Sequence, residues 1–261
     1  MATSTPAPID DGRYHSPWTR TVDLRTALRA AWAWLRAPRL LSRIYPALSH
    51  HLSHAPASTA YAFTLFVTWW TLRGLGPVEE RKLIFSASTN LHNMRDNPIQ
   101  VLVASAFWTE GNFPWVTIAE FLVLMALAER WLGTGRWILL FATGHIGATL
   151  LTVYGISRAI EHQMIPLRTA IVPDVGTSYG FVAVLTAMAF RFRGWVRLAW
   201  VATVLLVLLA AVISDRTFTA YGHLCAGLIG LFAAALATAF WTAVERRRVA
   251  QRLGEVPLSR G

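Results

Sequence analysis

The chain has 261 residues, of which 54% are apolar and only 15% are charged. Soluble domains contain about 45–50% apolar and about 25% charged residues, so this composition argues against a soluble domain, a disordered chain or a collagen. The net charge of +10 would suit a nucleic-acid-binding surface, but little of the chain is polar enough to form one. A single cysteine, Cys225, excludes an internal disulfide and a cysteine zinc cluster. The composition therefore predicts a membrane protein.

The N-terminal part of the chain combines arginines with apolar residues at helical spacing. Residues 24–36 form this pattern, and Pro38 ends it. A basic amphipathic helix of this kind is expected to lie on the inner leaflet, more as an anchor than as a lipid sensor. No basic stretch followed by an apolar core opens the chain, so no cleavable signal peptide is expected. The apolar face comprises Leu24, Leu28, Trp32 and Leu35, with Arg25, Arg29 and Arg36 beside it.

Six apolar runs follow, and each is close to the roughly 20 residues that a helix needs to cross the hydrocarbon core. They predict an all-α polytopic membrane protein with six transmembrane helices. Three regions result: a cytoplasmic N-terminal segment with the amphipathic helix, a membrane domain and a basic cytoplasmic tail. The stretch 74–111, between the first two runs, is too long for bare coil and is expected to form a re-entrant or interfacial structure. The runs are 55–72, 111–128, 137–157, 175–190, 198–214 and 217–244, and the three regions are 1–57, 58–244 and 245–261.

The distribution of basic residues predicts the orientation of these spans. With a cytoplasmic N-terminus, 17 of the 24 Lys and Arg residues fall on the inner side and 7 on the outer side. The positive-inside rule therefore favours cytoplasmic N- and C-termini. Since the basic surplus follows from topology, no nucleic-acid partner is expected.

Ionisable residues inside spans are costly, so each is a candidate for function. Three occur in the predicted spans: Glu120, His145 and His223. The fourth and sixth spans run in the same direction, which places Ser178 and His223 at a similar depth below the outer surface. A serine hydroxyl is a weak nucleophile until a base such as histidine removes its proton. Ser178 and His223 therefore form a candidate catalytic pair.

Three motifs in this chain resemble those of the rhomboid intramembrane serine proteases. Glu129, Arg130 and Gly133 match the Glu-Arg-x-x-Gly motif at the end of the second span. Residues 176–180, Gly-Thr-Ser-Tyr-Gly, are similar to the serine motif Gly-x-Ser-Gly. The order of the motifs, the six spans, the internal termini and the long first outer loop also resemble those of rhomboids, and the resemblance covers residues 58–244. The third motif is the histidine of the last span followed by small residues, represented here by His223, Ala226 and Gly230.

The resemblance implies a six-helix rhomboid-like bundle that hydrolyses a peptide bond in or near a transmembrane segment of another protein. Ser178 would attack the carbonyl, and His223 would act first as general base and then as general acid. No cofactor or metal is implied, and the partners would be the lipid bilayer and transmembrane proteins. Resemblance to divergent bacterial members implies a bacterial plasma membrane. Gly176 and Gly180, with Ala226 and Gly230, would have structural roles.

Support for the oxyanion is expected from other positions. The rhomboid His-x-x-x-Asn motif falls at Phe113 and Thr117 when aligned without gaps from Glu129, and of these two only Thr117 can donate a hydrogen bond. His145, near the middle of the third span, is a second candidate for polar support. An interhelical hydrogen bond is the more ordinary role for His145, and holding a turn is the expected role of Glu129 and Arg130.

Two alternatives to a protease remain open. Tyr179 stands where rhomboids have glycine, and the small-residue stripe of Gly180, Ala183 and Ala187 lies roughly 140–200° around the helix from Ser178. If that stripe meets the last span, Ser178 points elsewhere, and the chain would be a pseudoprotease that binds transmembrane helices of clients. A small transporter with a polar pathway through Glu120 and His145 is the other alternative.

A histidine cluster precedes the first span. It consists of His50, His51 and His54, residue types that bind metals. Carboxylate and thiol partners are lacking nearby, so no metal site is predicted.

Overall fold

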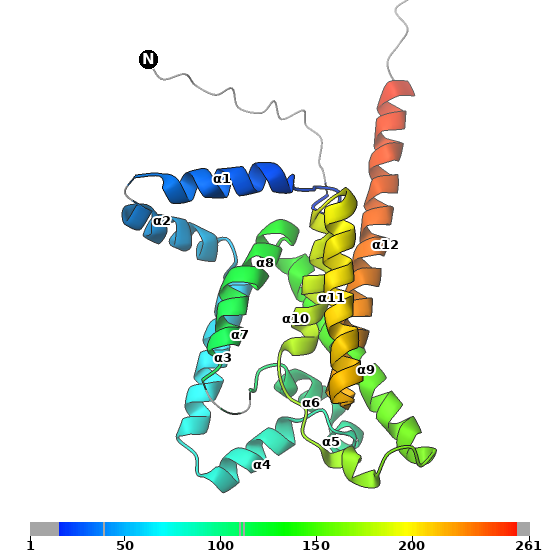
Figure 1. Cartoon of the computed structure of the whole chain (residues 1–261). Coiled ribbons are helices and arrows are strands. Elements are labelled where there is room, and N and C mark those ends of the chain that lie inside the picture. The colour runs from blue at the N-terminus through cyan, green and yellow to red at the C-terminus, as the bar shows by residue number, and fades with distance from the viewer. Residues whose placement is uncertain (1–15, 39, 110, 112, 255–261) are drawn as a thin grey trace, which may run out of the picture.

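The computed structural model describes residues 16–38, 40–109, 111 and 113–254, and throughout this part the regular structure is helical (Figure 1). Residues 1–15 and 255–261, which bear on the signal-peptide expectation and on the end of the predicted tail, lie outside the described residues. Three helices in this part of the chain are long and apolar enough to cross a membrane: α9, α11 and α12. The protein is therefore an all-α polytopic membrane protein, as predicted.

Each of the six predicted spans is helical in the structure. The second is interrupted by a π-helical turn, and the fourth ends in a 3₁₀ turn. The helices are α3 (Pro56–Arg73), α7 (Trp115–Glu120) with η1 (Phe121–Met125) and α8 (Ala126–Leu132), α9 (Thr134–Glu161), α10 (Ser178–Ala187) with η3 (Met188–Arg191), α11 (Gly194–Asp215) and α12 (Phe218–Gly254).

The centre of the bundle is the contact of α10 with α9 and α12, and small residues make it possible. Ala183 on α10 is fully buried between the two neighbours. A side chain at Gly144 on α9 would overlap with the methyl group of Ala183, and one at Gly230 on α12 would overlap with its carbonyl oxygen. Small residues at such crossings let helix backbones approach closely in membranes. The expected approach of the fourth and sixth spans is thus present, and Gly230 is one of its contact points.

Glu129 connects the end of the second span to the start of the first. Its carboxylate accepts hydrogen bonds from the backbone N–H groups of Ala57 (3.0 Å) and Ser58 (2.7 Å), in the first turn of α3, and from the hydroxyl of Thr134 (2.7 Å). The first N–H groups of a helix have no partner within the helix, so a buried carboxylate is a strong cap for them. Gly133 follows with a φ of +84°, a conformation that suits glycine, and its N–H bonds to the carbonyl of Glu129. These bonds connect the end of the second span to the first turn of α3 and to the turn at Gly133.

The histidines before the first span make local contacts. His51 accepts from the guanidinium of Arg130 at Nδ1 (2.8 Å), which leaves Nε2 to donate to the carbonyl of Leu122 (3.1 Å) in the π-helical turn. The rings of His50 and His54 are in contact at a tilted angle, with centroids 4.1 Å apart, and His54 also bonds to the carbonyl of His50. Among the described residues, no group of three His, Cys, Asp or Glu side chains could hold a metal ion.

The stretch between α3 and α7 forms three short helices at one end of the bundle: α4 (Pro77–Ala87), α5 (Leu91–Asp96) and α6 (Pro98–Ser105) (Figure 1). The side-chain amide of Asn93 connects α5 to α4 by donating to the carbonyls of Phe85 (2.6 Å) and Ser88 (3.0 Å). The expectation that this stretch is not bare coil is correct.

The opposite end of the bundle carries α1 (Leu24–Arg36) and α2 (Leu40–Ser53) (Figure 1). The axis of α1 points crosswise to the axis of α12. Asp23 caps α1, and Leu28, Trp32 and Leu35 are exposed. The predicted amphipathic helix is therefore present, and its direction suits a position in the plane of a membrane surface. Helix α2, which contains Pro46, was not expected from the sequence.

Candidate functional site

His223 lies near the start of α12 with its imidazole half-buried. Its Nε2 is buried and has no hydrogen-bond partner in the described part of the chain. The ring packs against the ring of Tyr179 on α10, edge to face, with centroids 5.3 Å apart. The side chain of α10 that meets the histidine is therefore Tyr179, the residue after the predicted nucleophile.

Tyr179 is held in this position from two sides. Its ring lies over Gly222, where any side chain would overlap with the phenol. Its hydroxyl donates to Oδ2 of Asp174 at 2.8 Å. A glycine beside His223 and a carboxylate before α10 thus fix the orientation of the tyrosine, which is itself buried.

Asp174 is the polar centre of this site. Its carboxylate also accepts from the hydroxyls of Thr89 and Thr219, each at 3.4 Å, while its backbone N–H donates to the hydroxyl of Ser88 at 2.6 Å. These partners come from the α4–α5 junction and from α12. Burial raises the pKa of the Asp174 carboxyl above its ordinary value, although the hydrogen bonds from Tyr179, Thr89 and Thr219 each favour the charged form.

Ser178 is the first residue of α10 and is half-buried. Successive residues of an α-helix are rotated by about 100°, so Ser178 does not share the helix face on which Tyr179 meets His223. Ser178 and His223 share no hydrogen bond in the described structure, and the hydroxyl of Ser178 donates to no other group there. Tyr179 and Ala183, four residues apart, form one face, so the small-residue stripe and the tyrosine meet α12 together.

His145, the buried histidine of α9, supports the turn that precedes Ser178. Its Nε2 lies 3.0 Å from the carbonyl of Leu102 and 3.2 Å from the hydroxyl of Ser105, both on α6. The carbonyl of Ser105 accepts the N–H of Gly176 at 2.8 Å, and Gly176 has a φ of +133° that requires glycine. His145 therefore makes the interhelical contact that was the more ordinary expectation. Its ring centroid is 6.5 Å from that of Tyr179.

The other predicted polar residues lie away from this site. Phe113 packs among aromatic rings, with Trp69 at 4.5 Å and Trp115 at 4.1 Å. Thr117 is half-buried on α7, where its hydroxyl makes no hydrogen bond within the described residues. Glu120, at the end of α7, is also half-buried. None of the three bonds to Ser178, His223 or Tyr179 in the described part.

Sequence reasoning missed Asp174 and the two residues that bond to its backbone, Ser88 and Thr89. Their pairing joins segments 85 residues apart, and no local pattern indicates it. For Tyr179 a signal was present, because it replaces the glycine of the serine motif five residues after Asp174.

The helical bundle, its glycine-mediated crossings and its buried polar site define a polytopic membrane protein in which the serine motif of α10 and the histidine motif of α12 lie side by side. A family model described as rhomboid-like protein matches residues 50–243, well over half of the chain. The chain belongs to the family of rhomboid-like proteins. No curated protein and no solved structure matches it significantly.

Proposed function

We propose that this rhomboid-like protein binds the transmembrane segments of client membrane proteins without cleaving them. The observation that supports this proposal is the contact between Tyr179 and His223, with the tyrosine anchored by Asp174. The accepting atom of a general base must come within about 2.6–3.2 Å of the oxygen whose proton it removes. The face of α10 that meets the imidazole carries Tyr179 instead of Ser178.

A weak oxyanion site supports the same proposal. Phe113 has no donor for an oxyanion, and Thr117 is the only hydroxyl at the two aligned positions. Loss of one preorganised oxyanion donor typically lowers the rate by about 10²–10³-fold. Together with the tyrosine, this loss disfavours proteolysis and leaves the bundle as a surface for binding helices.

A lateral cavity supplies a place for a client helix. It has a volume of about 450 Å³, lies between α3, α6 and α9, and is lined mainly by apolar side chains, among them Phe107, Phe141 and Val103. Binding cavities of this kind typically measure about 300–1,000 Å³. His145 also lines it, and its Nδ1 is buried without a hydrogen-bond partner among the described residues. We propose that apolar side chains of a client transmembrane helix enter here.

Activity-based labelling tests whether the protein cleaves. The purified protein is treated with a fluorophosphonate probe, with Ser178→Ala as the control. We expect equal background labelling of both. Labelling of the wild type that disappears in Ser178→Ala and in His223→Ala would show an active serine and overturn the proposal.

Photo-crosslinking tests whether clients bind. A crosslinking residue replaces Val103, which lines the cavity, or Leu198, an exposed residue of α11 outside it. Crosslinks to membrane proteins are expected from position 103 and not from position 198. The same crosslinks from both positions, or none from either, would contradict binding at the cavity.

A rhomboid-type protease is the second candidate. It is favoured by one observation: Nε2 of His223 is buried without a partner, and Ser178 lies on the neighbouring helix with a hydroxyl that makes no hydrogen bond in the described part. Replacing Tyr179 by glycine restores the residue type of the family motif. Labelling of Tyr179→Gly but not of the wild type would mean that the tyrosine blocks a latent pair, whereas labelling of the wild type would mean that the pair is active.

A further inference from the structure

The N-terminal segment, residues 16–22, packs against the end of the bundle beside α1. Trp18 is buried and meets Trp131 edge to face, with centroids 5.7 Å apart. Nε1 of Trp131 donates to the carbonyl of Pro17 (2.8 Å), and the N–H of Val22 donates to the carbonyl of Arg191 (2.8 Å). This segment is therefore fixed to α8 and to the turn before α11.

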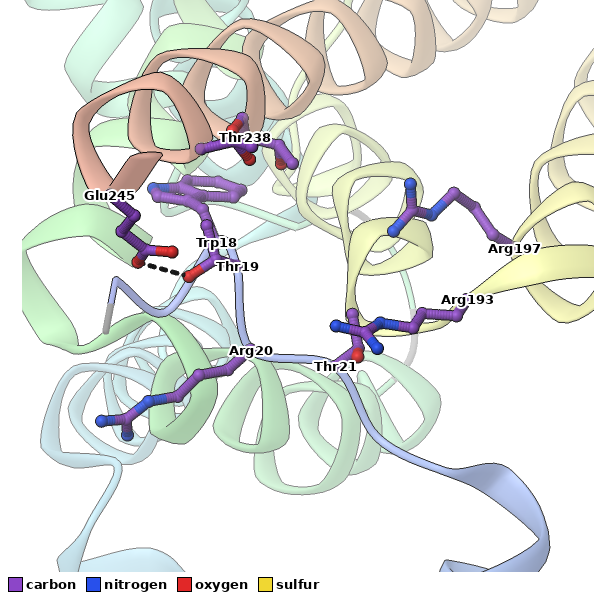
Figure 2. Close-up of a pocket in the computed structure, with 9 residues that line it drawn as sticks. Trp18, Thr19, Arg20, Thr21, Arg193, Arg197, Thr238 and Glu245 are labelled. Carbon is purple, nitrogen blue, oxygen red and sulfur yellow. Dashed lines mark hydrogen bonds between the residues drawn. The ribbon is translucent and has the colours of Figure 1, made fainter. Parts of the chain in front are cut away.

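Two cavities open on either side of this attachment, with volumes of about 420 Å³ and 550 Å³. Both are lined by Thr21 and Arg193, so they are neighbours. Arg197 and Thr238 line the smaller cavity, and Trp195 lines the larger. Figure 2 shows Arg193 and Arg197 extending from the same side of the smaller cavity.

The two arginines have no acidic partner in the described structure. Nε of Arg197 donates to the carbonyl of Phe192 (2.9 Å), and its guanidinium lies over the ring of Phe190 (4.8 Å). Arg193 makes no hydrogen bond or ion pair within the described residues. Two positive charges close together repel each other, and an anion between them would offset this repulsion.

The carboxylates that line the cavities form hydrogen bonds with groups other than the two arginines. Glu245 accepts from the N–H of Ser16 (3.0 Å) and the hydroxyl of Thr19 (2.8 Å), on the opposite side of the smaller cavity from the arginines (Figure 2). Asp23 caps α1 through the N–H of Arg25 (3.1 Å) and the hydroxyl of Thr26 (2.5 Å). Neither carboxylate forms an ion pair with Arg193 or Arg197 in the described part of the chain.

We propose that Arg193 and Arg197 bind a phosphate group, either of a phospholipid head group or of free phosphate. Guanidinium groups suit phosphate because their N–H groups match two oxygens at once. The hydroxyl of Thr238, buried and without a hydrogen-bond partner among the described residues, lines the same cavity. Trp195 is 70% exposed at the start of the lipid-facing helix α11, the position in which tryptophan contacts head groups. These contacts favour the phospholipid as the source.

A titration of the full-length protein in neutral detergent tests the site. A short-chain phosphatidylglycerol and inorganic phosphate are added in separate series, and the increase in Tm gives the half-saturating concentration. We expect a saturable increase with phosphatidylglycerol. The double variant Arg193→Gln/Arg197→Gln should raise the half-saturating concentration by about 25-fold, because each arginine near an anionic head group contributes about a fivefold factor.

Two further variants separate binding from folding. Arg193→Gln alone removes a side chain without intramolecular bonds in the described part, so its Tm without ligand should equal that of the wild type while the lipid response weakens. The matched control is Arg247→Gln/Arg248→Gln, which removes two exposed charges at the same end of the protein. An equally strong response to inorganic phosphate would assign the site to free phosphate. Equal responses of the wild type and Arg193→Gln/Arg197→Gln, or an equal loss in the control, would overturn the proposal.

Discussion

Tyr179 connects two motifs that the sequence places on separate spans. Its hydroxyl bonds to Asp174 before α10, and its ring covers Gly222 and contacts His223 on α12. A glycine at position 179 would leave the imidazole without this contact and without the link to the loop. The surroundings of His223 therefore depend on Tyr179 as much as the candidate pair depends on the presence of Ser178 and His223.

Asp174 should make the stability of the protein depend on pH. Because burial raises the pKa of its carboxyl, the folded state holds the proton more tightly than the unfolded state. The stabilising contribution of this group is complete below the unfolded-state pKa of about 3.9 and decreases as the pH rises through the higher folded-state pKa. The Tm of the wild type relative to Asp174→Asn should therefore fall as the pH rises through this window.

The measurement is a set of melting curves for both proteins over a series of acidic to neutral buffers. Asp96→Asn makes the same change at an exposed carboxylate and serves as the control. If the wild type gained stability over Asp174→Asn with rising pH, the described environment of Asp174 would be wrong.

Gly230 is the residue that sets the distance between α10 and α12. A methyl group there would overlap with the carbonyl oxygen of Ala183, so Gly230→Ala should destabilise the protein by about 1–3 kcal/mol, the usual cost of overpacking. The control is Gly155→Ala on the exposed side of α9, where an added methyl group meets no atom within 4 Å. That variant should be neutral or up to about 1 kcal/mol more stable, because alanine favours helix. Equilibrium unfolding in mixed detergent micelles compares the two, and equal effects would contradict the tight crossing.

At the site, the sequence predicts some relations and not others. The shared depth of Ser178 and His223 follows from span direction, and the structure places both near the starts of their helices. The rotation of α10 decides which side chain meets α12, and it depends on the fit of Ala183 between Gly144 and Gly230. That fit involves three helices at once. The sequence of α10 alone shows which residues form its small-residue face, but it does not show which neighbouring helix this face contacts.

At the scale of elements, the end of the second span stabilises the start of the first. Glu129 accepts two N–H groups of α3, so Glu129→Gln leaves one of these donors facing an amide N–H and removes a charge from the other bond. We expect a loss of about 1–3 kcal/mol, the usual cost of an unsatisfied buried donor. Glu161→Gln is the control, because Glu161 forms an exposed ion pair with Arg158 that is worth about 0–1 kcal/mol. Equal losses in the two variants, measured by equilibrium unfolding, would exclude the capping role.

Apolar runs predict where the helices lie but not how they are broken or joined. The third span was expected at 137–157 and is α9, Thr134–Glu161. The π-helical turn Phe121–Met125 has no sequence pattern of its own, because it is defined by which carbonyl each N–H reaches. The attachment of residues 16–22 depends on bonds such as that between Thr19 and Glu245, 226 residues apart. Contacts at that separation are outside the reach of local patterns.

For the whole molecule, the lipid-facing surface and the positions of the basic residues indicate one orientation in the membrane. Helix α11 has a single buried residue, Leu208, and exposes apolar side chains along its length. The C-terminal end of α12, which carries Arg246, Arg247 and Arg248, lies at the same end of the bundle as α1, and the short helices α4, α5 and α6 lie at the other end (Figure 1). The inner leaflet attracts basic segments, and the arginines of α1 would lie along its surface. The positive-inside rule therefore predicts that the end with α1 is cytoplasmic.

Cysteine accessibility tests this orientation, because Cys225 is the only cysteine in the chain. In a Cys225→Ala background, Met164→Cys places a thiol at an exposed residue between α9 and α10, and Arg248→Cys places one on the exposed end of α12. A membrane-impermeant maleimide applied to intact cells should label Met164→Cys, whereas Arg248→Cys should react only after the membrane is permeabilised. The positive-inside bias of 17 to 7 predicts this result. Labelling in the reverse order would place the arginine pair and α1 in the outer leaflet, and the polar site around Asp174 would then face the cytoplasm.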